Sequence, residues 1–464
     1  MSHNITDALI NEFQFSKFSN RVKHFFKSVN VSTLSRKSNI KKESGQSSMK
    51  ILYHIFLTPF FNESLTGLWK NGFIPSEFQG SGKDTYYRFL ANHKFNWRKF
   101  INLLAINAIS LLDKFSLWHE RVLILDDSTL PKRGRRIELV SWVFDSVSKK
   151  STLGFKKLVL GWSDGFSFIP FDFSLHVSSN RPNEYIKHLD KRTIGSKRRK
   201  EALMKKPELA LDMIRKAKIA GLDASYVLFD SWFAFPKFIK DVFDSGYDVV
   251  CKLKNMPNIR FSYKGRQYNL DALYRKFAKN NLKPLSHLPG KYSALNIQTK
   301  EGLAAKIVFY FDNKSKSWSA FLCTDLEATP EKVLKTYAKR WAIEPFFKEC
   351  KQNLYLGKER CRNFDSIFAS AAISIFRYIF VSITTRFESD PKTLGELFKT
   401  VQLDMHKLST SKIVLEIISD ETNRMSRALN LSEETISHMS IIMDSISSFL
   451  SSMLKFDHTL ECET

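Results

Sequence analysis

The sequence predicts a mixed α/β protein in which helices cover a β-sheet and helical regions lie at both ends of the chain. Apolar runs with β character alternate with helical segments between about residues 116 and 255. Short strand-like runs follow over 256–325, and amphipathic helical patterns occupy the flanking regions. With 464 residues, 43% of them hydrophobic, the chain is long enough for two or three domains and a large core.

The N-terminal region, residues 1–115, is expected to be a helical domain. A turn at Gln79–Gly82 precedes the basic, aromatic segment Lys83–Leu90, an order that suits a helix-turn-helix DNA-binding element. An ordinary surface helix would show the same pattern. The stretches that predict helices are 5–26, 49–60, 86–92 and 97–115.

Residues 116–255 are expected to form the first part of the sheet and its covering helices. The turn Asp164-Gly165 lies between two apolar runs and predicts a β-hairpin. The basic segment 191–200 is expected to be a loop, either solvated and mobile or following a DNA backbone. The predicted strands are 122–127, 157–163, 166–176, 226–230 and 247–254, and the predicted helices are 201–220 and 236–245.

A β-rich insertion is expected over 256–325, and residues 326–364 are expected to complete the core with a long helix. Thr329 suits the N-cap of this helix and Pro330 its first position, and the helix is predicted to run to about Asn353. The C-terminal region, 365–464, is predicted to be helical, with an acidic end that is unsuited to holding DNA. The predicted strands of the insertion are 260–268, 295–299, 305–312 and 318–324.

The charge of the chain points to a polyanionic partner. It has 72 Lys and Arg against 47 Asp and Glu, a formal net charge of +25, so nucleic acid is the first candidate and an anionic membrane surface the second. The apolar segment 369–384 falls short of the ~20 apolar residues that span a bilayer, and it contains Arg377. The N-terminus has no apolar signal core and the five cysteines form no Cys-x-x-Cys pair, so we expect a soluble intracellular protein without a zinc site.

Three acidic residues stand where a charge is costly without a role. Asp127 and Asp230 each end an apolar strand-like run, and Glu344 lies in the long predicted helix. Because ligands collect at the carboxyl ends of strands in open α/β sheets, these acids can converge on one all-oxygen Mg²⁺ site. Each aspartate alone would also be explained as a helix cap or turn former.

One narrow stripe of the predicted helix holds an acid among bases and aromatic residues. At about 100° per residue, these side chains fall on one side of a continuous helix. Such a stripe suits a metal ligand beside a phosphate track, and a solvated charged face would look the same. Pro345 is expected to kink the helix next to the acid. The residues of the stripe are Tyr337, Arg340, Trp341, Glu344, Lys348 and Lys351.

These residues carry a resemblance to the IS-four family of DDE transposases, extending over about residues 120–360. The spacing Tyr337-x2-Arg340-x3-Glu344-x6-Lys351 matches the tyrosine–arginine–glutamate–lysine signature of that family without a gap. The segments that begin at Asp127 and contain Asp230 resemble its first two catalytic segments; they are Asp127-Ser128-Thr129 and Phe229-Asp230-Ser231-Trp232-Phe233. The resemblance implies an RNase H-like core with a β insertion before the glutamate helix.

The resemblance also implies a mechanism and partners. Asp127, Asp230 and Glu344 would hold two Mg²⁺ or Mn²⁺ ions for strand cleavage and joining on double-stranded DNA. Tyr337, Arg340 and Lys351 would contact DNA phosphates, and an aromatic residue would stack on a displaced base. Trp318 is a candidate for this stacking, and an ordinary core tryptophan would fit the same place in the sequence. A homodimer in the DNA complex and a bacterial, nucleoid-associated cytoplasmic location are expected. The alternatives are a nuclease of the same core that does not join strands, and a DNA-binding transposon remnant without cleavage.

The first acid is a choice between two neighbours. Asp126 adjoins Asp127, and the apolar run before them is continuous, so strand alternation does not choose between them. Asp127 is preferred as the metal ligand because Ser128 and Thr129 follow it. Asp126 would then lie beside the ligand without binding the metal itself. The sequence therefore predicts that Asp127→Asn damages activity more than Asp126→Asn.

Overall fold

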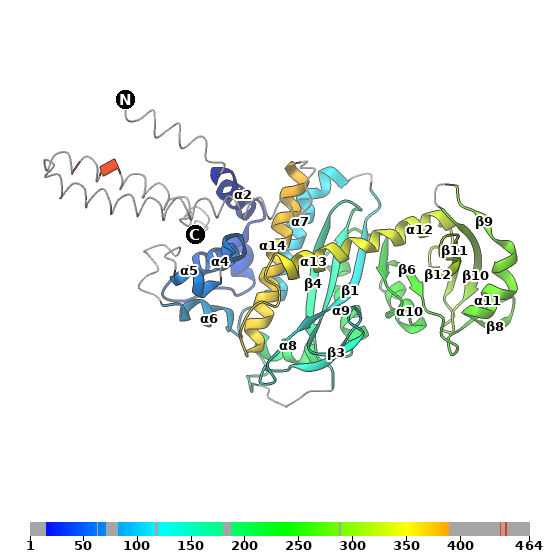
Figure 1. Ribbon diagram of the computed structural model, residues 1–464, viewed down its shortest axis with the longest axis horizontal. Helices are drawn as coiled ribbons and strands as arrows, with labels where there is room; N and C mark the ends of the chain where they lie inside the picture. Colours follow the sequence, from blue (N-terminus) through cyan, green and yellow to red (C-terminus); the bar gives the residue numbers. More distant parts are fainter. Residues whose placement is uncertain are drawn as a thin grey trace, which may run out of the picture. The chain divides into compact units, whose positions relative to one another are not determined.

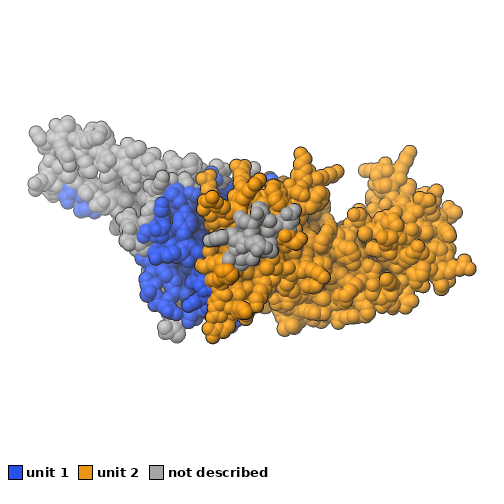
Figure 2. Space-filling model, turned by 90° about the horizontal axis from the view of Figure 1, so that it is seen from below, with its two compact units in different colours: residues 1–100, 349–359, 365–464 blue, residues 101–348, 360–364 orange. Residues whose placement is uncertain are grey.

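The computed structural model divides into two compact units, which Figure 2 shows in different colours. Unit 1 comprises residues 1–100, 349–359 and 365–464, and unit 2 comprises residues 101–348 and 360–364. The structure describes residues 15–62, 64–70, 82–116, 119–179, 187–286 and 289–388, together with residues 437, 441 and 442. The predicted domain boundaries stay predictions, and most of the acidic C-terminal end lies outside the described residues.

Unit 1 is helical where it is described, as the sequence predicts. Its core is aromatic: the rings of Phe56 and Phe376 lie 4.7 Å apart, and Phe26 lies 5.3 Å from both. Residues 79–81 of the predicted helix-turn-helix turn lie outside the described residues, so that element stays a prediction. The helices are α2 (Phe15–Ser28), α3 (Val31–Lys37), α4 (Ser48–Leu57), α5 (Leu65–Lys70), α6 (Asp84–Leu90), the start of α7 (Trp97–Ser116) and most of α14 (Phe364–Glu388).

The helix α14 extends beyond the apolar segment 369–384 at both ends. It has 25 residues, enough by length and composition to cross a membrane, but 94% of its most apolar window is buried inside the protein. Arg377 lies in the middle of α14 and donates to the carbonyl oxygens of Phe56 and Leu354, each at 3.0 Å. Because carbonyl oxygens of the core accept hydrogen bonds from it, the charged Arg377 side chain is compatible with burial in this helix.

A buried histidine makes the stability of unit 1 depend on pH. His54 Nδ1 lies 2.9 Å from Tyr86 Oη, and burial, followed by the charge of Lys50, lowers the pKa of His54 to about 4. The unfolded chain takes up this proton near pH 6.5, so stability is complete above that pH and is lost as the pH falls toward 4. We expect a loss on the order of 2 kcal/mol by pH 4.5.

The measurement is the melting temperature of the protein between pH 7 and pH 4.5, compared with that of His54→Gln. Glutamine keeps a hydrogen-bonding partner for Tyr86 but does not titrate. The variant should lose less stability than the wild type over this range. Equal pH slopes would show that His54 is not responsible.

Unit 2 is built on one mixed sheet of twelve described strands, which confirms the α/β class. In its centre β1 (Val122–Pro131), β5 (Tyr226–Phe229) and β6 (Asp248–Leu253) run parallel, and β3 (Lys150–Ser163) pairs antiparallel with β1. The strand order is β2-β3-β1-β5-β6-β12-β11-β10-β7-β8, with β4 on β3 and β9 on β10. The remaining strands are β2 (Ser141–Asp145), β4 (Phe168–His176), β7 (Arg260–Tyr263), β8 (Arg266–Asn269), β9 (Lys283–Pro284), β10 (Lys291–Gln298), β11 (Ala304–Asp312) and β12 (Ser317–Cys323).

The β insertion is confirmed, and it extends the core sheet. Strand β12 pairs antiparallel with β6, so the insertion strands continue the core sheet beyond β6 (Figure 1). The predicted hairpin is β3–β4, and Asp164 Oδ1 closes its turn by accepting from the backbone N–H groups of Phe166 and Ser167. Gly165 takes a positive φ of 91° there, which glycine adopts without strain.

The basic segment 191–200 is not a loop, which corrects the prediction. It enters α8 (Ile194–Leu203), whose N-cap Thr193 accepts from the backbone N–H of Ser196 at 3.3 Å. Arg199 is buried in this helix and forms an ion pair with Glu138 at 2.8 Å. The run of charges predicts a solvated loop, but two of the six basic side chains of this segment, Arg198 and Arg199, are buried in the protein. Helices α9 (Lys206–Ile219) and α10 (Pro236–Asp244) follow.

The long predicted helix is interrupted, which is a second correction. Thr329 caps α12 (Pro330–Ala338) as predicted, accepting from the backbone N–H of Lys332 at 3.2 Å. A 3₁₀ segment (Lys339–Ala342) then leads into α13 (Ile343–Gln352), which places Pro345 in the first turn of a new helix. Because Pro345 cannot donate a backbone hydrogen bond, the helix re-forms where that donor is not needed. The rotation about the helix axis is therefore not a uniform 100° per residue between Tyr337 and Lys351, so the predicted stripe of side chains is only approximate.

Candidate active site

Two aspartates lie at the same level of the sheet, where the parallel pairing of β1 with β5 ends: Asp126 within β1, and Asp230 directly after β5. In the pairing of β1 with β5, Leu125 lies opposite Phe229, so the next residues, Asp126 and Asp230, are adjacent. Asp230 follows the last residue of β5, and its Oδ1 accepts from the backbone N–H of Trp232 at 2.9 Å. The end of the parallel pairing between β1 and β5 thus brings two acids together, although β1 itself continues to Pro131.

The neighbours Asp126 and Asp127 point to opposite faces of the sheet, because side chains alternate along a strand. Asp126 shares its face with Ser128 and with Lys157 of β3, which lies opposite Ser128. Lys157 Nζ lies 4.8 Å from the centre of the Phe346 ring, so the Asp126 face is the one that α13 covers. Asp127 faces the other side.

An arginine joins Asp126 to the glutamate of α13. Arg340, in the 3₁₀ segment, donates from Nη1 to Asp126 Oδ2 at 2.7 Å and from Nη2 to Glu344 Oε1 at 3.3 Å. The Asp126 and Arg340 side chains are each 15% exposed, whereas that of Glu344 is 40% exposed. Asp126, Asp230, Arg340 and Glu344 therefore form one group that opens to solvent at Glu344.

On the opposite face, Asp127 lies between two lysines. Lys156 Nζ is 3.0 Å from Asp127 Oδ1, and Lys206, the first residue of α9, donates to Oδ2. Burial opposes ionisation of Asp127, but the two lysines outweigh it and hold its pKa below the usual range. Asp127 is thus a neutralised carboxylate with both oxygens engaged.

The pKa values of the other two aspartates move in the opposite direction. Burial, followed by the nearby charge of Asp230, raises the pKa of Asp126 to about 7, although Arg340 opposes this. Burial likewise raises the pKa of Asp230, with the Trp232 N–H and Arg340 opposing. Two buried acids that repel each other are stabilised by a cation bound between them.

The structure places the other predicted residues in three settings. Tyr337 packs on Phe321 with ring centres 4.8 Å apart and lies 6.0 Å from the Arg340 guanidinium. Trp341 is 67% exposed, and Lys348 is exposed on α13. Lys351 lies further along α13, in the part that belongs to unit 1.

Trp318 lies in the insertion with one aromatic neighbour stacked on it. Its ring is 4.6 Å from that of Tyr274 with an interplanar angle of 18°, and Phe309 contacts it edge-on at 5.7 Å. Tyr274 begins a short π-helical turn that the sequence analysis did not predict, because one turn leaves no periodic pattern. The stacking role proposed for Trp318 stays a prediction.

Three further residues lie at the site and were missed from the sequence. Lys156 and Lys206 bind Asp127, and Lys206 Nζ also lies 3.3 Å from the centre of the Trp232 ring. Trp232 is 45% exposed, two residues after Asp230. For Lys156, the signal was the pair Lys156-Lys157 inside an apolar strand, which indicates a buried partner. For Trp232, the signal was an aromatic residue two positions after an acid at a strand end.

The donor chemistry of the site fits a divalent cation. Its candidate ligands are carboxylate oxygens, which Mg²⁺ and Mn²⁺ prefer, and the raised pKa of Asp126 reflects burial and then the nearby charge of Asp230, a repulsion that a cation relieves. Across the described part of the chain no three acidic, histidine or cysteine side chains lie close enough to hold one ion. In this structure the positive charge beside Asp126 and Glu344 is the guanidinium of Arg340, which donates a hydrogen bond to each of the two carboxylates.

Comparison with known proteins identifies the class of domain. A family model described as "DDE superfamily endonuclease" matches residues 57–269, and one described as "Transposase DDE domain" matches residues 199–380. The chain therefore contains a DDE superfamily transposase domain, and the protein is a phosphoryl-transfer enzyme that acts on DNA. Domains of this superfamily typically use divalent metal ions.

Similarity outside these two models is distant. No curated protein shows significant sequence similarity to the chain. Among solved structures, the Drosophila P element transposase strand transfer complex matches with 11% sequence identity and a TM-score of 0.25, covering 89% of this chain and 72% of that one. The assignment to the DDE superfamily comes from the two domain models.

Proposed function

We propose that this protein is an IS-four family transposase that cuts DNA at the ends of an insertion sequence and joins the freed ends to target DNA. The observation that carries the proposal is the placing of Asp126 and Asp230 side by side beneath Arg340 and Glu344. The gapless signature from Tyr337 to Lys351 and the net charge of +25 give further support.

The catalytic acids are proposed to be Asp126, Asp230 and Glu344, with Asp126 in place of the Asp127 that the sequence favoured. Support comes from strand alternation, which puts Asp126 on the face that α13 covers, and from the two lysines that already engage Asp127. When bound, two Mg²⁺ or Mn²⁺ ions would activate the attacking water or 3′-hydroxyl and stabilise the leaving oxygen.

The neighbouring side chains would hold the DNA. Arg340, freed from one carboxylate, can donate two parallel hydrogen bonds to a phosphate, and Lys348 adds an exposed positive charge on α13. Tyr337 and Lys351 are proposed as further phosphate contacts and Trp341 and Trp318 as stacking residues. Asp127 would keep Lys156 and Lys206 in place beneath the site.

A strand-transfer assay tests this function. Purified protein is incubated with Mg²⁺, a labelled duplex carrying the flanking inverted repeat, and a supercoiled target plasmid. The proposal predicts cleavage at the repeat and joined product. Cleavage without joining would identify a nuclease, and binding without cleavage a DNA-binding remnant.

Assembly and location are also proposed. Two copies of the chain would act together on two transposon ends. Light scattering tests this by measuring the mass of the DNA complex, which should correspond to two protomers and not to one. A bacterial cytoplasmic location with association to the nucleoid follows from the same function and is checked by imaging a fluorescent fusion.

Trp232 is proposed to stack on a nucleobase beside the acids. Its exposed indole is held by Lys206 over the ring and by edge contacts from Phe233 and Phe235. Base stacking contributes ~1–3 kcal/mol, so Trp232→Ala should weaken binding of the cleaved DNA end by about tenfold in fluorescence anisotropy. Trp142→Ala, a change at another exposed tryptophan (38%) on β2, is the control and should bind like wild type. Equal affinities of the two variants would argue against stacking.

A further inference from the structure

Glu120, two residues before β1, contacts the helical segment that leads to Arg340 and Glu344. Its carboxylate accepts from Thr336 Oγ1 at 2.8 Å and from Lys339 Nζ at 2.9 Å. Lys339 Nζ also donates to the backbone carbonyl oxygen of Glu120 at 2.9 Å. Because Thr336 lies in α12 and Lys339 begins the 3₁₀ segment, one residue holds both sides of the point where the helix type changes.

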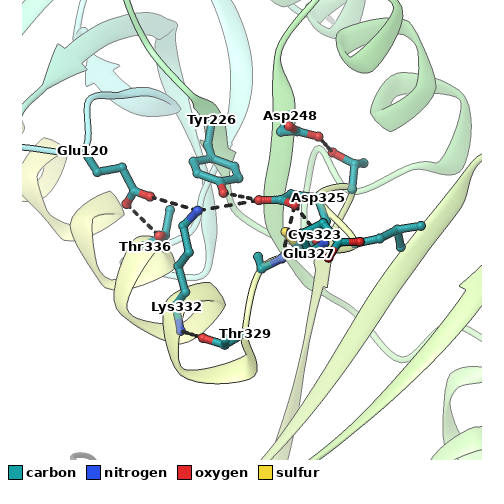
Figure 3. A network of polar contacts seen from close by, with 12 residues as sticks. Glu120, Tyr226, Asp248, Cys323, Asp325, Glu327, Thr329, Lys332 and Thr336 are labelled. Atoms are coloured by element: carbon teal, nitrogen blue, oxygen red, sulfur yellow. Dashed lines mark hydrogen bonds and ion pairs between the residues drawn. The ribbon is translucent and has the colours of Figure 1, made fainter.

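A second carboxylate continues this network (Figure 3). Lys332 Nζ, one turn earlier in α12, lies 3.9 Å from Glu120 Oε1 and 3.6 Å from Asp325 Oδ2. Tyr226 Oη donates to Asp325 Oδ2 at 2.5 Å. Tyr226 is the first residue of β5 and Asp325 follows β12, so the network ties α12 to the core sheet and to the insertion.

Consecutive residues of the 3₁₀ segment reach two separated points, one just before β1 and one within it. Lys339 contacts Glu120, and Arg340 contacts Asp126. The two acids are six residues apart, which is about 20 Å in an extended strand. A helical segment held at two such separated points can neither rotate about its axis nor slide along β1 without breaking one contact.

We propose that Glu120 is a positioning residue for the DNA cleavage proposed above. It fixes the rotation of the segment that presents Arg340 and Glu344 to Asp126 and Asp230. The Glu120 and Lys339 side chains are 24% and 23% exposed, so solvent partly screens this ion pair, and the melting temperature of each variant separates the positioning role from an effect on stability. Catalytic geometry is far more sensitive, since a displacement of about 1 Å lowers rates ~100-fold.

The test compares Glu120→Ala, Glu120→Gln and Asp223→Ala. Asp223 is the control, because its exposed carboxylate pairs with Arg121, next to Glu120 in the chain, at 2.8 Å rather than with a residue of α12. Four quantities are measured: single-turnover cleavage at saturating DNA, DNA affinity with Ca²⁺, Mn²⁺ affinity by electron paramagnetic resonance, and melting temperature.

Glu120→Ala should lower the cleavage rate and the Mn²⁺ affinity by ~10–100-fold, the usual range for residues that orient metal ligands. DNA affinity should stay within twofold, and the melting temperature should stay close to that of Asp223→Ala. Glu120→Gln, which still accepts from Thr336, should recover part of both losses.

Two results would overturn the proposal. One is unchanged cleavage and Mn²⁺ affinity in Glu120→Ala. The other is a loss that follows a lowered melting temperature or DNA affinity, which would make Glu120 merely structural. If the wild type itself does not cleave DNA, the proposed function fails, while the comparison of Mn²⁺ affinities still decides the role of Glu120.

Discussion

Asp126→Asn is expected to reduce the rate of Mg²⁺-dependent strand cleavage by ~100-fold or more while leaving the protein folded. Loss of a carboxylate that holds a catalytic metal removes several kcal/mol of transition-state stabilisation. Stability should not fall, because burial raises the pKa of Asp126 to about 7 and already disfavours its charge. The neutral amide still offers an oxygen to Arg340. Single-turnover cleavage and thermal melting of the same preparation measure both quantities.

Asp127→Asn is the matched comparison at the neighbouring position and should behave in the reverse way. It leaves the buried lysines Lys156 and Lys206 without a counter-charge, which costs about 3 kcal/mol and lowers the melting temperature by several degrees. At a temperature where the variant is folded, cleavage should remain well above that of Asp126→Asn. The ranking predicted from sequence is the opposite, so a more severe cleavage defect in a fully folded Asp127→Asn would restore Asp127 as the metal ligand.

Glu344→Gln is expected to abolish Mg²⁺-dependent cleavage with DNA binding preserved. The amide has the shape of the carboxylate but no charge to hold a divalent ion, whereas Arg340, Lys348 and Trp341 remain for the DNA. The Glu344 side chain is 40% exposed and bonds Arg340 at 3.3 Å, so its replacement should change stability little. Cleavage of a labelled inverted-repeat duplex and its anisotropy with Ca²⁺ separate the two effects.

Glu327→Gln is the control, since Glu327 is exposed in the loop between β12 and α12 and carries the same change of charge. It should cleave and bind like wild type. If Glu344→Gln cleaves at an undiminished rate, the glutamate has no catalytic role. If both variants lose DNA binding equally, net charge rather than the site controls affinity.

Much of the fold follows from local sequence signals. The hairpin around Asp164-Gly165 and the cap at Thr329 each depend on a few neighbouring residues, and both occur where predicted. Strand β2 and the π-helical turn at Tyr274 were missed because short elements leave no detectable period. The basic segment before residue 200 was misassigned because its helix depends on Glu138, a partner about 60 residues away.

The site was predicted in part. Asp230 and Glu344 lie in one group through the contacts of Arg340 with Asp126, as their places at a strand end and on a helix suggested. The prediction of one narrow stripe on a continuous helix was less accurate, since the 3₁₀ segment changes the angle about the helix axis between Tyr337 and Glu344. The network of Glu120 with α12 was invisible, because its residues are more than 200 positions apart.

The sequence by itself determined the α/β class, the place of the insertion strands and the positive charge, because these depend on composition and on patterns within a few residues. Only the tertiary structure decided how Asp126 and Asp127 differ. Alternation along β1 sends them to opposite faces, but which face carries α13 and which carries Lys206 depends on how segments about 80 to 220 residues away pack on the sheet. That long-range packing leaves no local trace in two adjacent aspartates after a continuous apolar run.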